Sequence, residues 1–245
     1  AGQPALADFH PIADHPYRYD TVETRTMGET PERFAAHRTI VFHRDGAGWI
    51  ASLTLDSVEH PDTPVGAMFA AANAGLLHRT TRLRLDTAGN VTGIDDIDAQ
   101  WAAFVDGIEH LALSTTPAGA QRAKAAAAAA ASLRAAPLAK RVSILASELP
   151  DMIARRQPGD EREMPQADGT IVTTTHSSAD LPPAAKALPG ATPATTRGTI
   201  VRAMVRRVDP ATGLVLENRR ETTITLQSAQ APTSRIEKTV ILRPE

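Results

Sequence analysis

The stretch LDTAGNVTGIDDIDAQWAAFVDGIEHLAL (Leu85–Leu113) contains the change from strand to helix on which the fold depends. Its first part places Asp86 and Asn90 around a glycine turn, and three more aspartates follow Gly93. A calcium loop of the EF-hand type needs oxygen ligands at alternate positions before its glycine and a glutamate well after it. Because these three aspartates come after the glycine, the stretch predicts a hairpin turn and then a helix, not a calcium loop.

The aspartates also suit the start of that helix. Asp95 or Asp96 is well placed as the N-cap, and carboxylates in the first turn are favoured by the helix dipole. The apolar residues beyond them recur at helical spacing: Ile97, Trp101, Phe104, Val105, Ile108 and Leu111. We therefore expect an amphipathic helix whose centre, Trp101, is buried against a sheet.

The helical region continues to about residue 156. Residues 118–135 consist largely of strong helix formers, and Pro137 then interrupts. A further helix is expected from about Leu138 to Leu149, with Leu138, Val142, Leu145 and Leu149 on one face, and Pro150 suits the first turn of a short continuation. The alanine run, Ala125–Ala131, allows either close packing or a solvated helix, and we favour the solvated helix.

Strand signals lie on both sides of this helical region. Tyr17–Met27 and Phe34–His43 are strand-like, and Asp45-Gly46-Ala47-Gly48 reads as a hairpin turn. After residue 156, β-branched strands return around a proline-rich loop at residues 181–196 and end with Arg235–Leu242. The order strands, helices, strands predicts an α+β fold. We expect one domain spanning residues 1–245, with N-terminal strands in 17–94, helices in 95–156 and C-terminal strands in 160–242.

Composition excludes several classes of protein. The chain has 245 residues, a formal net charge of −2, 4% aromatic residues and no cysteine. Disulfides, thiolate nucleophiles and cysteine-based zinc sites are therefore excluded. The charge and the few aromatic residues argue against a nucleic-acid partner, and no apolar run is long enough for a transmembrane segment. A start at Ala1-Gly2 instead of methionine suits an exported, periplasmic bacterial protein after removal of a signal peptide.

Familiar catalytic motifs are missing from the sequence. It contains no Gly-x-Ser-x-Gly elbow, no HExxH helix, no P-loop and no Gly-x-Gly-x-x-Gly fingerprint. The segment THSSAD holds His176, Ser177, Ser178 and Asp180, but neighbours on a strand point to opposite faces. We therefore expect this segment to be structural, and we favour binding over catalysis while an enzyme without familiar motifs stays open.

The eight histidines do not form an obvious metal site. His10, His15 and His60 precede prolines and suit loops. His37 and His43 share a strand face but stand about 20 Å apart at roughly 3.3 Å per residue, too far to bind one ion. Glu109 and His110 are the best remaining pair, and we expect no metal and no other cofactor.

Arginines gather in the two long C-terminal strands: Arg202, Arg206, Arg207, Arg219 and Arg220. Such a patch would suit phosphate or lipid head groups. Glu217 and Glu221 lie among them, and cross-strand pairing on a solvated face explains the mixture without a ligand. We favour the solvated face.

The order of elements resembles the periplasmic lipoprotein-carrier fold of the LolA and LppX type. The resemblance covers about residues 17–242 and rests on long strands with Asp-Gly turns, a helical insertion at mid-chain and a return to strands. It implies a large antiparallel sheet in the form of an open half-barrel, with the helices packed on one face over a hydrophobic concavity. No sequence motif accompanies it, so it assigns no functional residue.

Three functions remain open. The favoured one is an exported, non-catalytic protein that binds a hydrophobic or lipid-like ligand between the sheet and the helices. The second is an accessory subunit that docks on a protein partner or membrane complex, and the third is an enzyme without familiar motifs. A cavity would favour the first, an exposed apolar patch the second and converging polar side chains the third. The residues expected to line a ligand pocket, if they are not ordinary core, are Trp49, Phe69, Trp101, Phe104 and Ile108.

Overall fold

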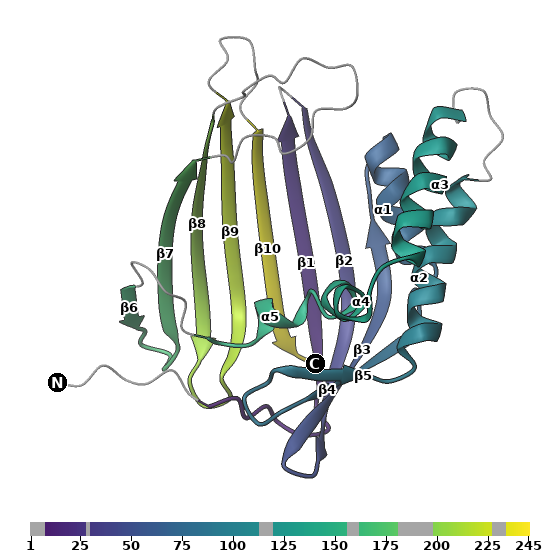
Figure 1. Cartoon of the computed structure of the whole chain (residues 1–245). Coiled ribbons are helices and arrows are strands. Elements are labelled where there is room, and N and C mark those ends of the chain that lie inside the picture. Colours follow the sequence, from purple (N-terminus) through teal and green to yellow (C-terminus); the bar gives the residue numbers. More distant parts are fainter. Residues whose placement is uncertain (1–7, 28–29, 113–119, 156–161, 181–197, 227–233) are drawn as a thin grey trace.

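One antiparallel sheet of ten strands dominates the computed structural model, which describes residues 8–27, 30–112, 120–155, 162–180, 198–226 and 234–245 (Figure 1). Its order is β5-β4-β3-β2-β1-β10-β9-β8-β7-β6. The strands are β1 (Pro16–Met27), β2 (Thr30–Asp45), β3 (Gly48–Glu59), β4 (Thr80–Leu85), β5 (Val91–Ile94), β6 (Arg162–Pro165), β7 (Ile171–Asp180), β8 (Gly198–Asp209), β9 (Leu214–Leu226) and β10 (Ser234–Pro244).

The sheet consists of two meanders that meet in its middle. The first runs outward from β1 to β5, and the second returns from the far edge, β6, to β10, which pairs with β1. In that central pairing Thr21 lies opposite Val240 and Glu23 opposite Lys238. The predicted open antiparallel sheet of an α+β protein is thus confirmed, and the ends of the chain supply its central strands.

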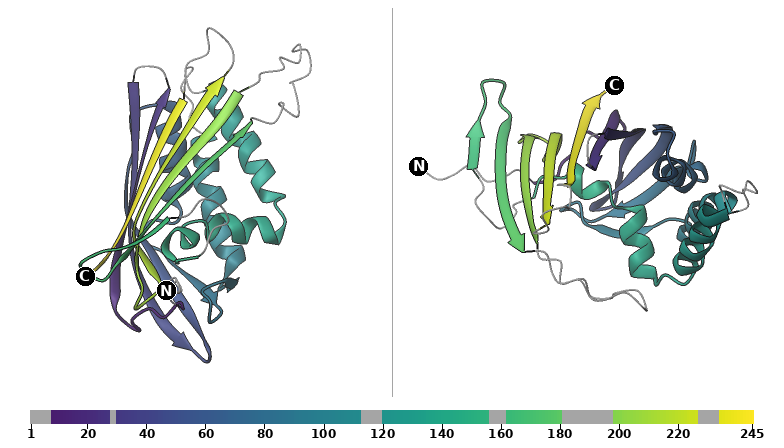
Figure 2. Two further views of the ribbon diagram at one scale, coloured as in Figure 1. Left: turned by 90° about the vertical axis from the view of Figure 1, so that its left-hand side faces the viewer. Right: turned by 90° about the horizontal axis from the view of Figure 1, so that it is seen from above.

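The described helices pack on one face of this sheet, here named the helix-bearing face (Figure 2). They are α1 (Pro64–Ala74), α2 (Ile97–Ala112), α3 (Ala120–Arg134), α4 (Leu138–Leu145) and α5 (Leu149–Met152). The first three stand beside the N-terminal strands, whereas α4 and α5 cross the sheet towards β9 (Figure 1). None of the helices in the described ranges is long and apolar enough to cross a membrane.

Helix α1 was not predicted, since helices were expected only in residues 95–156. The local signals are nonetheless present: the Thr63 hydroxyl accepts a hydrogen bond from the Gly66 amide at 3.1 Å, and Pro64 occupies the first turn. Both features are typical of a helix start. The helix has small and apolar side chains on all of its faces, so it lacks a distinct apolar stripe. Periodicity alone therefore could not reveal it.

The predictions for α2 and α3 need two corrections. Trp101 is buried as expected, with 4% exposure, but it packs among helices and not against the sheet. Ala126 and Ala130 are fully buried in the same cluster, whereas Ala127 and Ala128 are exposed. The alanine run is therefore not simply solvated: its small side chains at i and i+4 allow α3 to lie close to α2.

Helix α4 is shorter than predicted. It begins after Pro137, as expected, but it ends at Leu145, and Leu149 belongs to the separate α5. Leu138 was placed on the apolar face, yet its side chain is 60% exposed, because the first turn of α4 projects beyond the helical cluster. The prediction that Pro150 lies in the first turn of a short continuation is confirmed.

The aspartates of residues 85–98 have structural roles. The Asp86 carboxylate accepts hydrogen bonds from the amides of Ala88 and Asn90, which forms the β4–β5 turn. Asp96 precedes α2 and its carbonyl accepts the Gln100 amide, although its φ of 50° is unusual for an N-cap. Asp95 instead pairs with Arg84 of β4 at 2.7 Å, which ties the start of the helix to the sheet.

Two separate hydrophobic cores stabilise the molecule. The sheet core joins the inward side chains of the central and N-terminal strands with α5 and includes Tyr19, Phe42, Trp49 and Leu149. The helical core is built from α2 and α3, with α1 and α4 packed against them. None of the described residues belongs to both clusters. The helical layer is thus stabilised largely by itself, and its contact with the sheet leaves a groove.

A candidate ligand groove between the two hydrophobic cores

A cavity of about 220 Å³ lies where the helical layer faces β2, β3 and β4. Leu53 and Leu55 line it from the sheet, and Phe69 and Phe104 line it from the helices, with Leu76, Ile144 and Leu145 around them. The polar side chains that border it are Arg38, Asn73, Arg79, Thr81, Ser147 and Glu148. The cavity therefore has apolar walls on two opposite sides and charged groups at its border.

A smaller cavity of about 90 Å³ adjoins it over β1 and β2. The two share Arg38, Phe69 and Glu148, so we describe them together as the groove. Phe34 of β2 meets Phe69 edge to face, with ring centroids 5.3 Å apart. Taken together, the cavities only reach the lower end of the roughly 300–1,000 Å³ usual for ligand pockets, so the groove suits a small or single-chain molecule.

Strand alternation explains which side chains reach the groove. Arg38 and Tyr19 lie opposite each other on β2 and β1 and both face the helices. His37, the neighbour of Arg38, points to the other face, where it contacts Asp20 at 2.6 Å. A bulge between His37 and Arg38 shifts the register with β3 at this point. Bulges of this kind re-aim side chains, and here the bulge lies beside the one arginine shared by both cavities.

A chain of charged groups runs from the groove across the helix-bearing face. Glu148, which precedes α5, lies 3.6 Å from Arg38 and 3.5 Å from Lys238. Lys238 also contacts Asp151 of α5 at 2.8 Å, and Asp151 pairs with Arg220 at 2.7 Å. Burial on its own would lower the pKa of Lys238, but Glu148 and Asp151 outweigh burial and raise the pKa above its ordinary value. Lys238 is therefore a cation throughout the physiological range.

Tyr19 anchors this charged chain to the sheet core. Its hydroxyl lies 3.1 Å from a carboxylate oxygen of Glu148 and 3.2 Å from the Glu148 carbonyl. Burial, together with the charges of Glu148 and Asp151, raises the pKa of Tyr19 well above its ordinary value. The phenol thus stays protonated and donates a hydrogen bond to Glu148, which holds the start of α5 at the border of the groove.

The five residues predicted to line a pocket lie in three different places. Phe69 and Phe104 line the groove. Trp101 stacks on Phe104 but, like Ile108, belongs to the helical core. Trp49 belongs to the sheet core, and its ring faces another cavity. The structure thus brings two of the five together at the groove and connects Trp101 to it through the stacked ring of Phe104.

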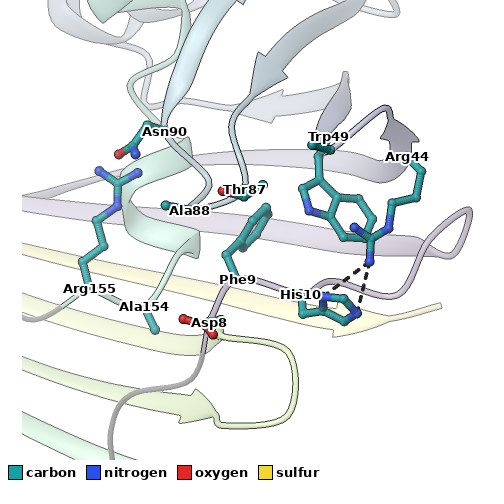
Figure 3. A pocket seen from close by; sticks show the side chains of 11 residues that line it. Asp8, Phe9, His10, Arg44, Trp49, Thr87, Ala88, Asn90, Ala154 and Arg155 are labelled. Atoms are coloured by element: carbon teal, nitrogen blue, oxygen red, sulfur yellow. Dashed lines mark hydrogen bonds between the residues drawn. The ribbon is translucent and has the colours of Figure 1, made fainter.

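The cavity beside Trp49 has a volume of about 650 Å³ and lies between the N-terminal segment and the β2–β3 and β4–β5 turns (Figure 3). The Arg44 guanidinium stacks on the Trp49 ring at 3.7 Å and contacts His10 at 3.1 Å. Arg155 donates a hydrogen bond to the Gly89 carbonyl at 3.0 Å. Both arginines here already have protein partners, and Trp49 itself is almost fully buried. The groove differs in having apolar walls on two opposite sides, which makes it the better site for a ligand with an apolar chain.

The other predicted chemical groups are spread over the molecule. Ser177 faces the helix-bearing side, whereas the neighbouring His176 faces the opposite side, as strand alternation predicts. His43 contacts Asp14, and Glu109 pairs with Arg134. Within the described ranges no three histidine, aspartate or glutamate side chains lie close enough together to hold a metal ion.

The structure corrects part of the prediction of a solvated arginine patch: Arg219 is exposed and pairs with Glu217, as expected, but the five arginines do not share one face. Arg207 and Arg219 point outward, but Arg202, Arg206 and Arg220 lie on the helix-bearing face. Arg206 is only 3% exposed and donates a hydrogen bond to the Arg155 carbonyl at 2.9 Å. Residue parity along β8 and β9 could have separated these two sets, because alternate residues share a face. Arg38, Glu148, Asp151 and Lys238 were missed because nothing in their local sequence distinguishes them.

No protein-family model matches the chain, and no curated protein matches its sequence. Among solved structures it is similar to one described as the structure of DynF from the dynemicin biosynthesis pathway of Micromonospora chersina. The two share 7% sequence identity over all of this chain and 86% of that chain, with a TM-score of 0.18. A likeness at this level carries no argument about function. The function is therefore inferred from the groove itself.

Proposed function

We propose that this protein binds, without chemical conversion, a small amphiphile that has one apolar chain and an acidic group, and that the chain occupies the groove. The observation that carries this proposal is the cavity between the sheet and the helical layer, with Leu53 and Leu55 on one wall and Phe69 and Phe104 on the other. Apolar surface facing a void lacks the contacts that a ligand chain would supply.

The charges around the groove favour an acidic head group. Four cationic side chains line the two cavities, Arg25, Arg38, Arg79 and Lys238, against two carboxylates, Glu23 and Glu148. Arg38 lies where the cavities meet, and its side chain is only 13% exposed. A carboxylate or phosphate beside it would form charge-assisted hydrogen bonds, which are roughly twice as strong as neutral ones.

We extend this proposal to a lipoprotein-carrier role of the LolA type and to export to the periplasm. The open sheet with helices on one face agrees with such a fold, but the small groove suits one chain better than several. Docking of a protein partner has less support. Among the described residues of β8, Val201 and Val205 are exposed large apolar side chains on the outer sheet face, but they stand four positions apart along the strand.

Titration with a fluorescent fatty-acid analogue, followed by competition with carboxylates of increasing chain length, tests the proposal. Asn73 borders the groove from α1, and its side chain bonds only the Phe69 carbonyl among the described residues. Asn73→Phe should fill the cavity and weaken binding at least about tenfold, whereas Asn73→Ala loses the same hydrogen bond but keeps the space and should bind normally. Equal affinity in both variants, or no saturable binding to the unmodified protein, would contradict the groove as the site.

A further inference from the structure

A second, polar hollow lies on the helix-bearing face over β7, β8 and β9. Its volume is about 430 Å³, and it is lined by Thr175, Ser177, Arg202, Met204, Arg220 and Thr222. Cross-strand register explains this set. Ser177 pairs with Arg202, which pairs with Thr222, and the adjacent row is Thr175, Met204 and Arg220. Hydroxyl and guanidinium groups from three neighbouring strands therefore share one space.

Of the two arginines in this hollow, Arg202 has no carboxylate partner among the described residues and Arg220 has N–H donors to spare. Arg202 is exposed, and no carboxylate of the described residues pairs with it. Arg220 pairs with Asp151 at 2.7 Å, but a guanidinium has five N–H donors and one such contact leaves others available. Arg202 and Arg220 are diagonal neighbours across β8 and β9, about 7–8 Å apart by sheet geometry. An anion between them would relieve the repulsion of like charges.

A buried hydroxyl points to the same conclusion. The Thr175 side-chain oxygen is buried and has no hydrogen-bond partner among the described residues. In the next row down, the Thr173 hydroxyl is also buried without a partner among the described residues. Leaving such groups unsatisfied costs stability, so most buried polar atoms in proteins do have partners. An oxyanion in the hollow would accept a hydrogen bond from the Thr175 hydroxyl.

We propose that this hollow binds a phosphate-type oxyanion, held by Arg202 and Arg220 and by the hydroxyl of Thr175. The anion belongs either to the head group of an amphiphile or to a soluble phosphorylated molecule. Arg220 lies opposite Lys238 in the sheet, and Lys238 lines the groove, so the hollow adjoins the groove through this pair. The inference stands on the hollow alone and does not require an acyl chain in the groove.

Calorimetric titration with glycerol 3-phosphate, with glycerol as the neutral control, tests the site. We expect saturable binding of the phosphate that weakens with added salt, and none of glycerol. Arg202→Gln should weaken it by about tenfold or more, because a charge-assisted contact is lost. Arg219→Gln makes the same charge change on the opposite face and should bind normally. Thr175→Val should weaken binding without lowering the melting temperature, because its oxygen bonds no described protein group.

Dioctanoyl phosphatidic acid distinguishes the two sources of the anion. Binding of this lipid but not of glycerol 3-phosphate, with loss in Arg202→Gln, would support the site as one for a lipid head group. Similar affinities for both would support a soluble phosphorylated ligand. Retained glycerol 3-phosphate binding in Asn73→Phe would show that this site is independent of the groove. Absence of saturable binding for both phosphates, or affinities in Arg202→Gln and Thr175→Val equal to that of Arg219→Gln, would overturn the proposal.

Discussion

The indole N–H of Trp101 donates a hydrogen bond to the Leu133 carbonyl at 3.1 Å, so that α2 is tied to the last turn of α3. The ring is 4% exposed and stacks on Phe104, which lines the groove. Trp101→Ala should lower the free energy of unfolding by about 3–5 kcal/mol, because it removes a buried ring and leaves a void. Urea denaturation measures this change, and a loss well under 1 kcal/mol would show that the helical core does not depend on this ring.

Close packing of α3 against α2 predicts a contrast between two alanines. Ala130 is buried in the helical core, whereas Ala128 on the same helix is exposed. Ala130→Leu should destabilise the protein by about 1–3 kcal/mol through overpacking, whereas Ala128→Leu should have little effect. The two substitutions change helix propensity by the same small amount, so a difference between the melting temperatures of the two variants reports packing. Equal melting temperatures would instead indicate a solvated α3.

A similar contrast applies where α1 crosses α2. A Cβ built on Gly107 would lie 2.1 Å from the Ala71 carbonyl oxygen, so the helices must separate to admit a methyl group. Gly107→Ala should therefore destabilise the protein, although alanine favours a helix over glycine by about 0.5–1 kcal/mol. Gly93→Ala in β5 meets no atom within 4 Å and is the matched control. A more stable Gly107→Ala variant would show that the two helices do not cross this closely.

Asp20 predicts how stability depends on acid pH. Burial alone would raise its pKa, but hydrogen bonds from His37 and Arg18 outweigh burial and hold the pKa below its ordinary value of 3.8. Because the pKa is lower in the folded state, the stabilisation is present above pH 3.8 and is lost as the pH falls through the folded value. Denaturation midpoints from about pH 7 to about pH 2 should therefore fall less steeply in Asp20→Asn than in the unmodified protein. Parallel curves would exclude this contribution.

Much of the fold could be predicted from the sequence, because strand alternation, turn glycines and Pro137 act locally. The Asp45–Gly48 hairpin and the return of strands after the helices are examples. Helix α1 was not predicted because its alanine-rich sequence has no periodic apolar stripe. The close packing of α3 was not predicted because alanine is tolerated both in a core and in water. The charged chain of the site depends on which residues the sheet brings together: Asp151 and Lys238 lie 87 positions apart. No local pattern encodes such a contact.

Native mass spectrometry of the gently purified protein tests the central claim, binding of an acidic amphiphile in the groove, most directly. We expect the unmodified protein and Asn73→Ala to retain an additional mass that fragments as an amphiphile with one apolar chain. Asn73→Phe, whose ring should fill the space between Leu55 and Phe104, should be found without it. An unmodified protein without any added mass that also fails to take up single-chain carboxylates from solution, or an Asn73→Phe variant that retains the full added mass, would contradict the account.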